Sequence, residues 1–296
     1  MNPGILYAFL AFVLWGLFPI YFKTLHQIPT LELLAHRMAW SLLFVLAVLL
    51  VRHHWRWLGP VLRNPRVLGR FAASAVLLSA NWGIYIWAVN AGHIVEASLG
   101  YFINPLINVL FGYAFLGERL RPLQWSAVGI AAAGVAWLTW QNGTLPWISL
   151  ALAITFGGYG LLRKTAQLGA LEGLTLETLL LFPVAIVYLS ALGLSGASHF
   201  GHAPLAFQLL LVCAGPVTAI PLLLFAAAAR RIALSTLGLV QYVTPTLQLL
   251  TGVLVYHEPF GPVRAAGYGA IWVALALYSF EGLRSSASAR GARGAA

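Results

Sequence analysis

Ionisable residues stand inside long apolar runs of this sequence, where burying a charge costs free energy. Glu32 and His36 are four residues apart, so they share one face of a helix, and Arg37 follows directly. Such a cluster could bind a charged solute or carry protons. Because Glu32 and His36 also stand near the start of their run, their side chains could instead simply reach its polar boundary. The sequence leaves both interpretations open.

A second set combines amide and aromatic side chains, which suits a cavity for a planar or amphipathic solute. Asn81 and Trp82 lie in the middle of one apolar run, and Tyr85 is one helical turn beyond Asn81. Tyr101 and Asn104 are three residues apart in the next run. Asn81 could alternatively hydrogen-bond a neighbouring helix without any solute. The predicted substrate-binding residues are Asn81, Trp82, Tyr85, Tyr101, Asn104, Gln241 and Tyr242.

Glu96 is the main candidate for proton coupling, with Glu32 and His36 as further candidates. It begins an apolar run, nine residues before Pro105. A carboxylate that is accessible first from one side of a membrane and then from the other could carry protons across it. The alternative is a carboxylate that stays charged because it lies at the positive N-terminal end of a helix dipole.

Two prolines, Pro105 and Pro245, lie in the middle of apolar runs. Each lacks a backbone donor and frees the carbonyl four residues earlier, at Tyr101 and Gln241. Broken helices at membrane depth usually line cavities. We therefore predict that both prolines are hinges, although kinks that serve packing alone would give the same pattern.

The sequence contains no motif for nucleotide binding, metal binding or catalysis. There is no phosphate-binding loop and no dinucleotide glycine pattern. The histidines between the apolar runs have no accompanying cysteine or carboxylate, so we expect no metal site. We predict no catalytic residues and no cofactor.

The composition indicates which elements must position these residues. Of the 296 residues, 60% are apolar and only 8% are charged, with seven Glu and no Asp. A soluble domain carries about 25% charged residues. The formal charge of +10 comes from Arg and Lys in short stretches between apolar runs, which argues for membrane orientation rather than nucleic-acid binding.

The apolar runs have the length of membrane-spanning helices, roughly 20 residues. Most of the basic residues follow the even-numbered runs, which places both termini in the cytoplasm by the positive-inside rule. The ten runs are 5–22, 31–51, 71–90, 96–116, 123–140, 147–162, 173–194, 206–229, 235–256 and 263–280.

The two halves of the chain resemble each other. A shift of 140 residues aligns Pro105 with Pro245 and Glu118 with Glu258. Five helices per repeat is an odd number, so the second repeat must be inverted, which is typical of transporters. The predicted fold is an all-α polytopic membrane protein with ten transmembrane helices in two inverted repeats, at 1–141 and 145–283. We expect residues 284–296 to be a disordered cytoplasmic tail.

Several stretches resemble a known family. Residues 96–105 and 115–119 resemble the EamA repeat of the drug/metabolite transporter superfamily. One departure is His257-Glu258, where the second repeat more often has Gly-Glu. The resemblance covers nearly the whole chain. The runs that resemble the RarD group within the family are His36-Arg37, Asn81-Trp82, 86–90, 159–164, 235–238, Gln241-Tyr242 and 271–276.

This resemblance implies ten helices, a bacterial inner-membrane location and export of small molecules; RarD proteins are associated by name with chloramphenicol sensitivity. We therefore expect a secondary transporter that exports small organic solutes or drugs. The alternative is a membrane-integral enzyme acting on a lipid or isoprenoid, which would need clustered acidic or histidine residues. The expected partners are a small-molecule solute and the lipid bilayer but no nucleic acid, and a homodimer stays open.

Overall fold

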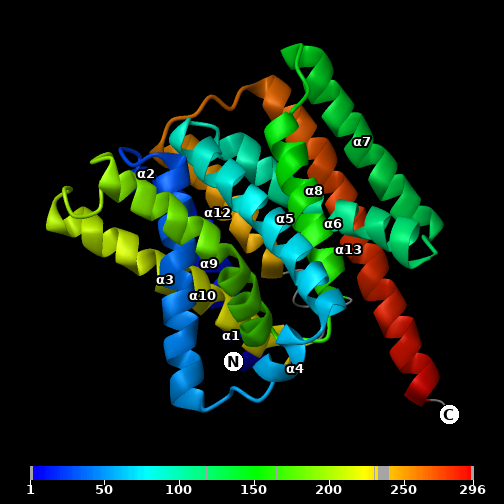
Figure 1. Ribbon diagram of the computed structural model, residues 1–296. Helices are drawn as coiled ribbons and strands as arrows, with labels where there is room; N and C mark the ends of the chain where they lie inside the picture. Colours follow the sequence, from blue (N-terminus) through cyan, green and yellow to red (C-terminus); the bar gives the residue numbers. More distant parts are fainter. Residues whose placement is uncertain (1–2, 118, 165, 230, 233–239, 295–296) are drawn as a thin grey trace.

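The computed structural model describes residues 3–117, 119–164, 166–229, 231–232 and 240–294 (Figure 1). Regular structure in these ranges is helical throughout, with no strand. The helices are α1 Pro3–Gly16, α2 Phe18–Thr24, α3 Thr30–Arg52, α4 Leu58–Leu62, α5 Pro65–Asn90, α6 Ile94–Leu116, α7 Pro122–Asn142, α8 Trp147–Lys164, α9 Ala170–Leu194, α10 Leu205–Ala229, α12 Val243–Leu250, the π-helix η1 Thr251–Val255 and α13 Pro262–Gly294.

Among the described residues, seven helical segments are long and apolar enough to cross a membrane. Two shorter apolar helices, Trp147–Arg163 and Val243–Val255, join them, and α7 coincides with the fifth predicted run. The multi-pass helical fold is thus confirmed, whereas the count of ten spans stays a prediction. The seven segments are Pro3–Thr24, Thr30–Arg52, Pro65–Asn90, Ile94–Leu116, Ala170–Leu194, Leu205–Phe225 and Pro262–Glu281.

Two segments differ in detail from the sequence-based expectation. The first apolar run is divided into α1 and α2 at Leu17. The break follows from Pro19, which has no backbone N–H for the Trp15 carbonyl. That carbonyl instead accepts a hydrogen bond from Nε2 of Gln248 on α12, at 3.2 Å. At the other end of the chain, α13 continues as a helix to Gly294, through a segment that we expected to be disordered.

The helices pack mainly against partners from the other half of the chain. Helix α6 packs on α8 and on α12, α3 packs on α9 and α10, and α1 packs on α10. Helices α7 and α13 lie side by side along one edge of the bundle, away from α3, α9 and α10 (Figure 1). Two large apolar clusters form the core, one around α2, α5 and the start of α6, the other between α6, α7 and α13.

Candidate functional site

A hydrogen-bonded cluster around Asn81 joins three helices near the centre of the bundle. The Asn81 Nδ2 donates to the Leu152 carbonyl at 3.0 Å and to Thr155 Oγ1 at 3.0 Å, both on α8. Its Oδ1 accepts from the Tyr101 hydroxyl of α6 at 3.3 Å. The cluster therefore connects α5 and α6 of the first half with α8 of the second. Asn81 thus hydrogen-bonds a neighbouring helix, and its solute-binding role stays a prediction.

Arg37 is a buried cation beside this cluster. Its side chain is only 3% exposed, and its guanidinium carbon lies 4.0 Å from the centre of the Trp82 ring. The Phe22 ring lies 5.3 Å from the same carbon. The Arg37 Nε donates to Thr218 Oγ1 of α10 at 2.8 Å. The guanidinium is thus enclosed by α2, α3, α5 and α10, with an aromatic face close enough for a cation–π interaction.

Two buried polar atoms near this guanidinium have no hydrogen-bond partner among the described residues: Nη1 of Arg37 and the hydroxyl of Tyr85. The Tyr85 ring lies 6.0 Å from the Phe22 ring and 5.7 Å from the Tyr101 ring. Aromatic rings therefore link the guanidinium to the Asn81 cluster. Buried polar groups are rarely left unpaired, so each such atom needs an explanation.

A close approach of two helices positions Arg37 against Thr218. A Cβ atom added to Gly215 of α10 would lie 2.3 Å from the carbonyl oxygen of Trp40 on α3. Only glycine permits this contact. Thr218 and Gly215 are three residues apart on α10, as are Arg37 and Trp40 on α3, so the close contact also brings Thr218 to the guanidinium.

Glu32 and His36 lie together, as their spacing predicts, but their contacts lead to a loop. The buried Glu32 carboxylate accepts the backbone N–H of His199 at 2.8 Å and lies 2.7 Å from His199 Nδ1. The His36 Nε2 is 4.0 Å away from the same carboxylate. Glu32 thereby fastens the loop between α9 and α10 to the start of α3.

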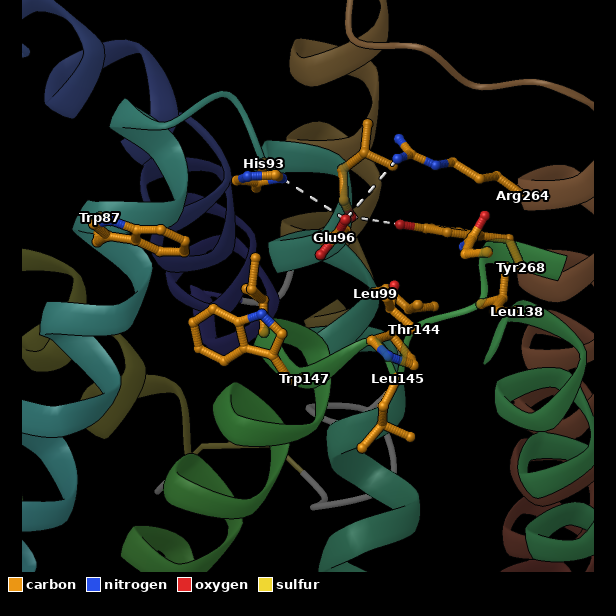
Figure 2. A pocket seen from close by; sticks show the side chains of 14 residues that line it. Trp87, His93, Glu96, Leu99, Leu138, Thr144, Leu145, Trp147, Arg264 and Tyr268 are labelled. Atoms are coloured by element: carbon orange, nitrogen blue, oxygen red, sulfur yellow. Dashed lines mark hydrogen bonds and ion pairs between the residues drawn. The ribbon is translucent and has the colours of Figure 1, made fainter. Parts of the chain in front are cut away.

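Glu96 faces a separate cavity of about 350 Å³ (Figure 2). One of its carboxylate oxygens lies 3.7 Å from His93 Nδ1 and 3.9 Å from Arg264 of α13. The cavity lies between the start of α6, the loop before α8 and the start of α13. Its walls are mostly apolar and aromatic, and include Trp87, Leu99, Leu138, Leu145, Trp147 and Tyr268.

The start of α6 is capped by a residue from the second half of the chain. Both carboxylate oxygens of Glu258 accept backbone N–H groups there, from Ile94 at 2.7 Å and from Val95 at 2.8 Å. The cap that helix N-termini need is therefore supplied by Glu258. Glu96 lies in the first turn of α6, makes neither of these hydrogen bonds and faces the cavity, so both interpretations of its role stay predictions.

Comparisons with known proteins indicate the family. The sequence model of the EamA-like transporter family matches residues 2–140. Protein RarD of Escherichia coli is 45% identical over 282 residues, 95% of each chain. A protein of Pseudomonas aeruginosa that carries the name uncharacterized transporter is 50% identical over 287 residues, 96% of each chain. This chain belongs to the EamA-like transporter family.

Further relatives refine this assignment. The chloramphenicol-sensitive protein RarD of Pseudomonas aeruginosa is 35% identical over 291 residues, 96% of this chain and 95% of its own. A crystal structure with 22% identity matches 93% of this chain and 96% of its own at a TM-score of 0.57, which indicates a shared fold. The chain is an EamA-like transporter of the RarD group and not an enzyme.

Within this EamA-like transporter, four of the predicted solute-binding residues lie together: Asn81, Trp82, Tyr85 and Tyr101. Asn104 instead donates to the Ala153 carbonyl of α8 at 3.2 Å. Tyr242 packs in the cluster of α6, α7 and α13. No hydrogen bond or ring contact within the described ranges joins Gln241 or Tyr242 to the Asn81 cluster, so their solute-binding role stays a prediction.

The two proline positions differ in the EamA-like fold. Pro105 lies inside the continuous helix α6, whereas Pro245 is the third residue of α12. A turn at Tyr242 precedes α12, and the π-helix η1 follows it. Irregular helix of this kind is frequent at functional sites. The hinge role of both prolines remains a prediction.

Arg37 was considered only as part of the charged cluster with Glu32 and His36 and was not among the predicted solute-binding residues, although its signal was present: a single arginine inside an apolar run. Glu177 was also missed. It is fully buried on α9, accepts from Ser74 Oγ at 2.5 Å and lies 3.9 Å from Arg163 Nη1. Its signal was the Thr-Leu-Glu sequence that it shares with Glu32.

Some predictions fall outside the ranges that the structure describes: Glu118 and the resemblance at 235–238. Within those ranges, no group of three or more His, Cys, Asp or Glu side chains could hold a metal ion. The structure assigns His257 a positive φ of 53°, the region that favours glycine. A glycine there, which the resemblance to the EamA family implies as the usual residue, would adopt this conformation without strain.

Proposed function

We propose that this protein is a secondary transporter that exports small organic solutes by alternating access of two inverted halves. The proposal rests on the hydrogen bonds of Asn81 and Arg37, because they join the two halves of the chain. Asn81 and Arg37 come from the first half, and their hydrogen-bond partners Thr155 and Thr218 come from the second. A binding site between two repeats can be exposed to one side at a time when the repeats move against each other.

The packing of the helices supports the inverted repeat at 1–141 and 145–283. Three contacts join helices that are counterparts in the two halves: α3 with α9, α6 with α12, and α7 with α13. Others come in exchanged pairs. Helix α1 packs on α10, and its counterpart α8 packs on α5; α6 packs on α8, and α12 packs on α1. A two-fold pseudo-symmetry produces this pattern.

We further propose that the protein lies in the bacterial inner membrane with both termini in the cytoplasm. The clusters of basic residues after the even-numbered runs support this orientation. Reporter fusions after Arg119 should report the cytoplasm, and fusions at Asn142 the opposite side. If both fusions report the same side, the ten-span topology is wrong.

We propose that a proton gradient drives transport and that Glu96 carries the proton. Its carboxylate lines a cavity and has two basic neighbours, His93 and Arg264, whose contacts would respond to its charge. Glu32 and His36 remain further candidates, but Glu32 is engaged with a loop. A homodimer stays open as a further proposal.

The decisive experiment is counterflow in proteoliposomes. Purified protein is reconstituted, loaded with an unlabelled solute and offered the labelled form outside. The panel consists of neutral and charged aromatic compounds and chloramphenicol, since one relative carries that drug in its name. Saturable uptake that requires internal solute is the expected result. Flux that does not saturate would indicate a channel, and no counterflow with any member of the panel would contradict the proposal.

A further inference from the structure

Arg37 is a charged group in an apolar environment and has no counter-ion among the residues that the structure describes. It lies on a helix that is long and apolar enough to span a membrane, seven residues after its start at Thr30, or about 10 Å along the axis. The described residues offer no carboxylate within 4.0 Å of its guanidinium, and the nearby Glu32 is paired with His199. An arginine at such a depth is expensive and faces a partner or a functional cavity.

The contacts of Arg37 leave its Nη1 without a hydrogen-bond partner among the described residues. The Nε donates to Thr218, and the planar face lies on the ring of Trp82. The Nη1 donor is buried and unpaired within the described structure. Cation–π contacts lower the cost of burying the charge, but they do not satisfy an N–H group.

The second unpaired group is the hydroxyl of Tyr85, which can donate a hydrogen bond. Phe22 contacts both sides of this arrangement, because its ring lies 5.3 Å from the Arg37 guanidinium carbon and 6.0 Å from the Tyr85 ring. Two donors that have no partner among the described residues, one of them charged, therefore belong to side chains that both lie beside the Phe22 ring. Guanidinium N–H groups and phenol hydroxyls are both good donors to a carboxylate oxygen.

Charge balance restricts the ligand further. A single guanidinium neutralises one negative charge, whereas a dianion such as a phosphate monoester would leave one charge uncompensated in an apolar site. A neutral solute would leave the guanidinium without a counter-ion. The rings of Trp82 and Phe22 beside the guanidinium favour a ligand with an apolar body, since aromatic faces bury apolar area well.

We propose that Arg37 and Tyr85 form the anchor for a carboxylate, so that the solutes of this transporter are organic monocarboxylates with a compact apolar body. This inference rests on the proposed transport function and adds a substrate class to it. In the bound state, one carboxylate oxygen accepts from Arg37 Nη1 and from the Tyr85 hydroxyl. The apolar body lies against Trp82 and Phe22.

The competing explanation is that Arg37 serves packing alone, through its aromatic neighbours and Thr218. Binding experiments with matched pairs of ligands separate the two. Three carboxylates and their uncharged amides are titrated into purified protein in detergent by isothermal calorimetry. The pairs are benzoate and benzamide, phenylacetate and phenylacetamide, and hexanoate and hexanamide. At least one carboxylate should bind about tenfold or more tightly than its amide, because a charged hydrogen bond is lost in the amide.

Variants identify the residues. Arg37→Gln should remove the preference for the carboxylate, whereas Arg66→Gln, which removes an exposed arginine at the start of α5, should leave it unchanged. Tyr85→Phe keeps the ring and the packing and should weaken carboxylate binding about three- to tenfold, so the test does not depend on how well Arg37→Gln folds. Equal binding of acid and amide in all three pairs would overturn the inference, and so would Tyr85→Phe and Arg37→Gln variants that bind the acids as wild type does.

The same proteins in the counterflow assay separate this inference from the proposed function. Saturable counterflow of neutral solutes alone, unchanged in Arg37→Gln, would preserve the transporter and overturn the carboxylate anchor. Carboxylate binding that depends on Arg37, combined with no counterflow of any solute, would preserve the anchor and contradict the transport mechanism.

Discussion

Gly215→Ala tests the helix contact that positions Arg37. The added Cβ would lie 2.3 Å from the Trp40 carbonyl oxygen, 2.7 Å from the carbonyl carbon and 3.2 Å from the Ser41 nitrogen. All three are backbone atoms, so no side chain can rotate away. Helices α3 and α10 must separate by about 1 Å to restore ordinary contact distances of about 3.5 Å. Such a shift would lengthen the 2.8 Å bond between Arg37 and Thr218 beyond hydrogen-bonding distance.

The expected magnitude follows from two opposing effects. Overpacking typically costs about 1–3 kcal/mol. Alanine is favoured over glycine in a helix interior by about 1 kcal/mol, which offsets part of that cost. Gly129→Ala on α7 is the matched control, because nothing lies within 4 Å of its added Cβ. The two variants should therefore differ by about 1–3 kcal/mol, with Gly129→Ala at or above the stability of wild type.

Thermal unfolding in detergent micelles, followed by tryptophan fluorescence, measures this difference. The melting temperature of Gly215→Ala should fall below that of Gly129→Ala by several degrees, on the order of 2–4 °C for each kcal/mol. Gly215→Ala should also weaken the binding of whichever carboxylate the wild type prefers. If the two variants melt within about 1 °C of each other, the close contact between α3 and α10 is wrong, and with it our reason for the position of Thr218.

Two further predictions concern the start of α6. Glu258→Ala leaves the backbone N–H groups of Ile94 and Val95 without acceptors, so it should lower the free energy of unfolding by about 2–4 kcal/mol. Glu258→Gln keeps one acceptor and should lower it less. If wild type and Glu258→Ala have equal melting temperatures in detergent micelles, the cap is wrong. Glu96→Gln should abolish solute accumulation driven by a pH gradient and retain exchange, with Glu281→Gln as the control; continued accumulation by Glu96→Gln would exclude its coupling role.

Much of the fold could be predicted from hydropathy, because a membrane-spanning helix must be apolar over its full length. The run at 173–194 corresponds to α9, Ala170–Leu194, and the run at 96–116 to α6, Ile94–Leu116. Finer features depend on distant contacts. The division of α1 from α2 is tolerated because Gln248 supplies the donor that Pro19 lacks, and the two residues are far apart in the sequence.

The sequence predicts which site residues share a face of one helix, but not which residues meet between helices. Helical spacing correctly placed Asn81 and Tyr85 on one face, but it carries no information about which helix they face. The bond of Asn81 to Tyr101 and the stacking of Arg37 on Trp82 became visible only in three dimensions. The apolar run around Arg37 indicates that the arginine is buried, but not which residue it contacts, because its partner Thr218 is 181 residues away.

The cap on α6 also defines which pieces of the molecule can move as units. Glu258 fastens the start of α6 to the segment after η1, and Glu32 fastens the start of α3 to the loop before α10. Each link joins two different halves of the chain. The start of α6 can therefore shift only together with that segment, or by breaking two hydrogen bonds. The boundaries of the two predicted repeats therefore differ from those of the segments that these hydrogen bonds hold together, and distance probes for the proposed transport cycle belong on either side of the latter.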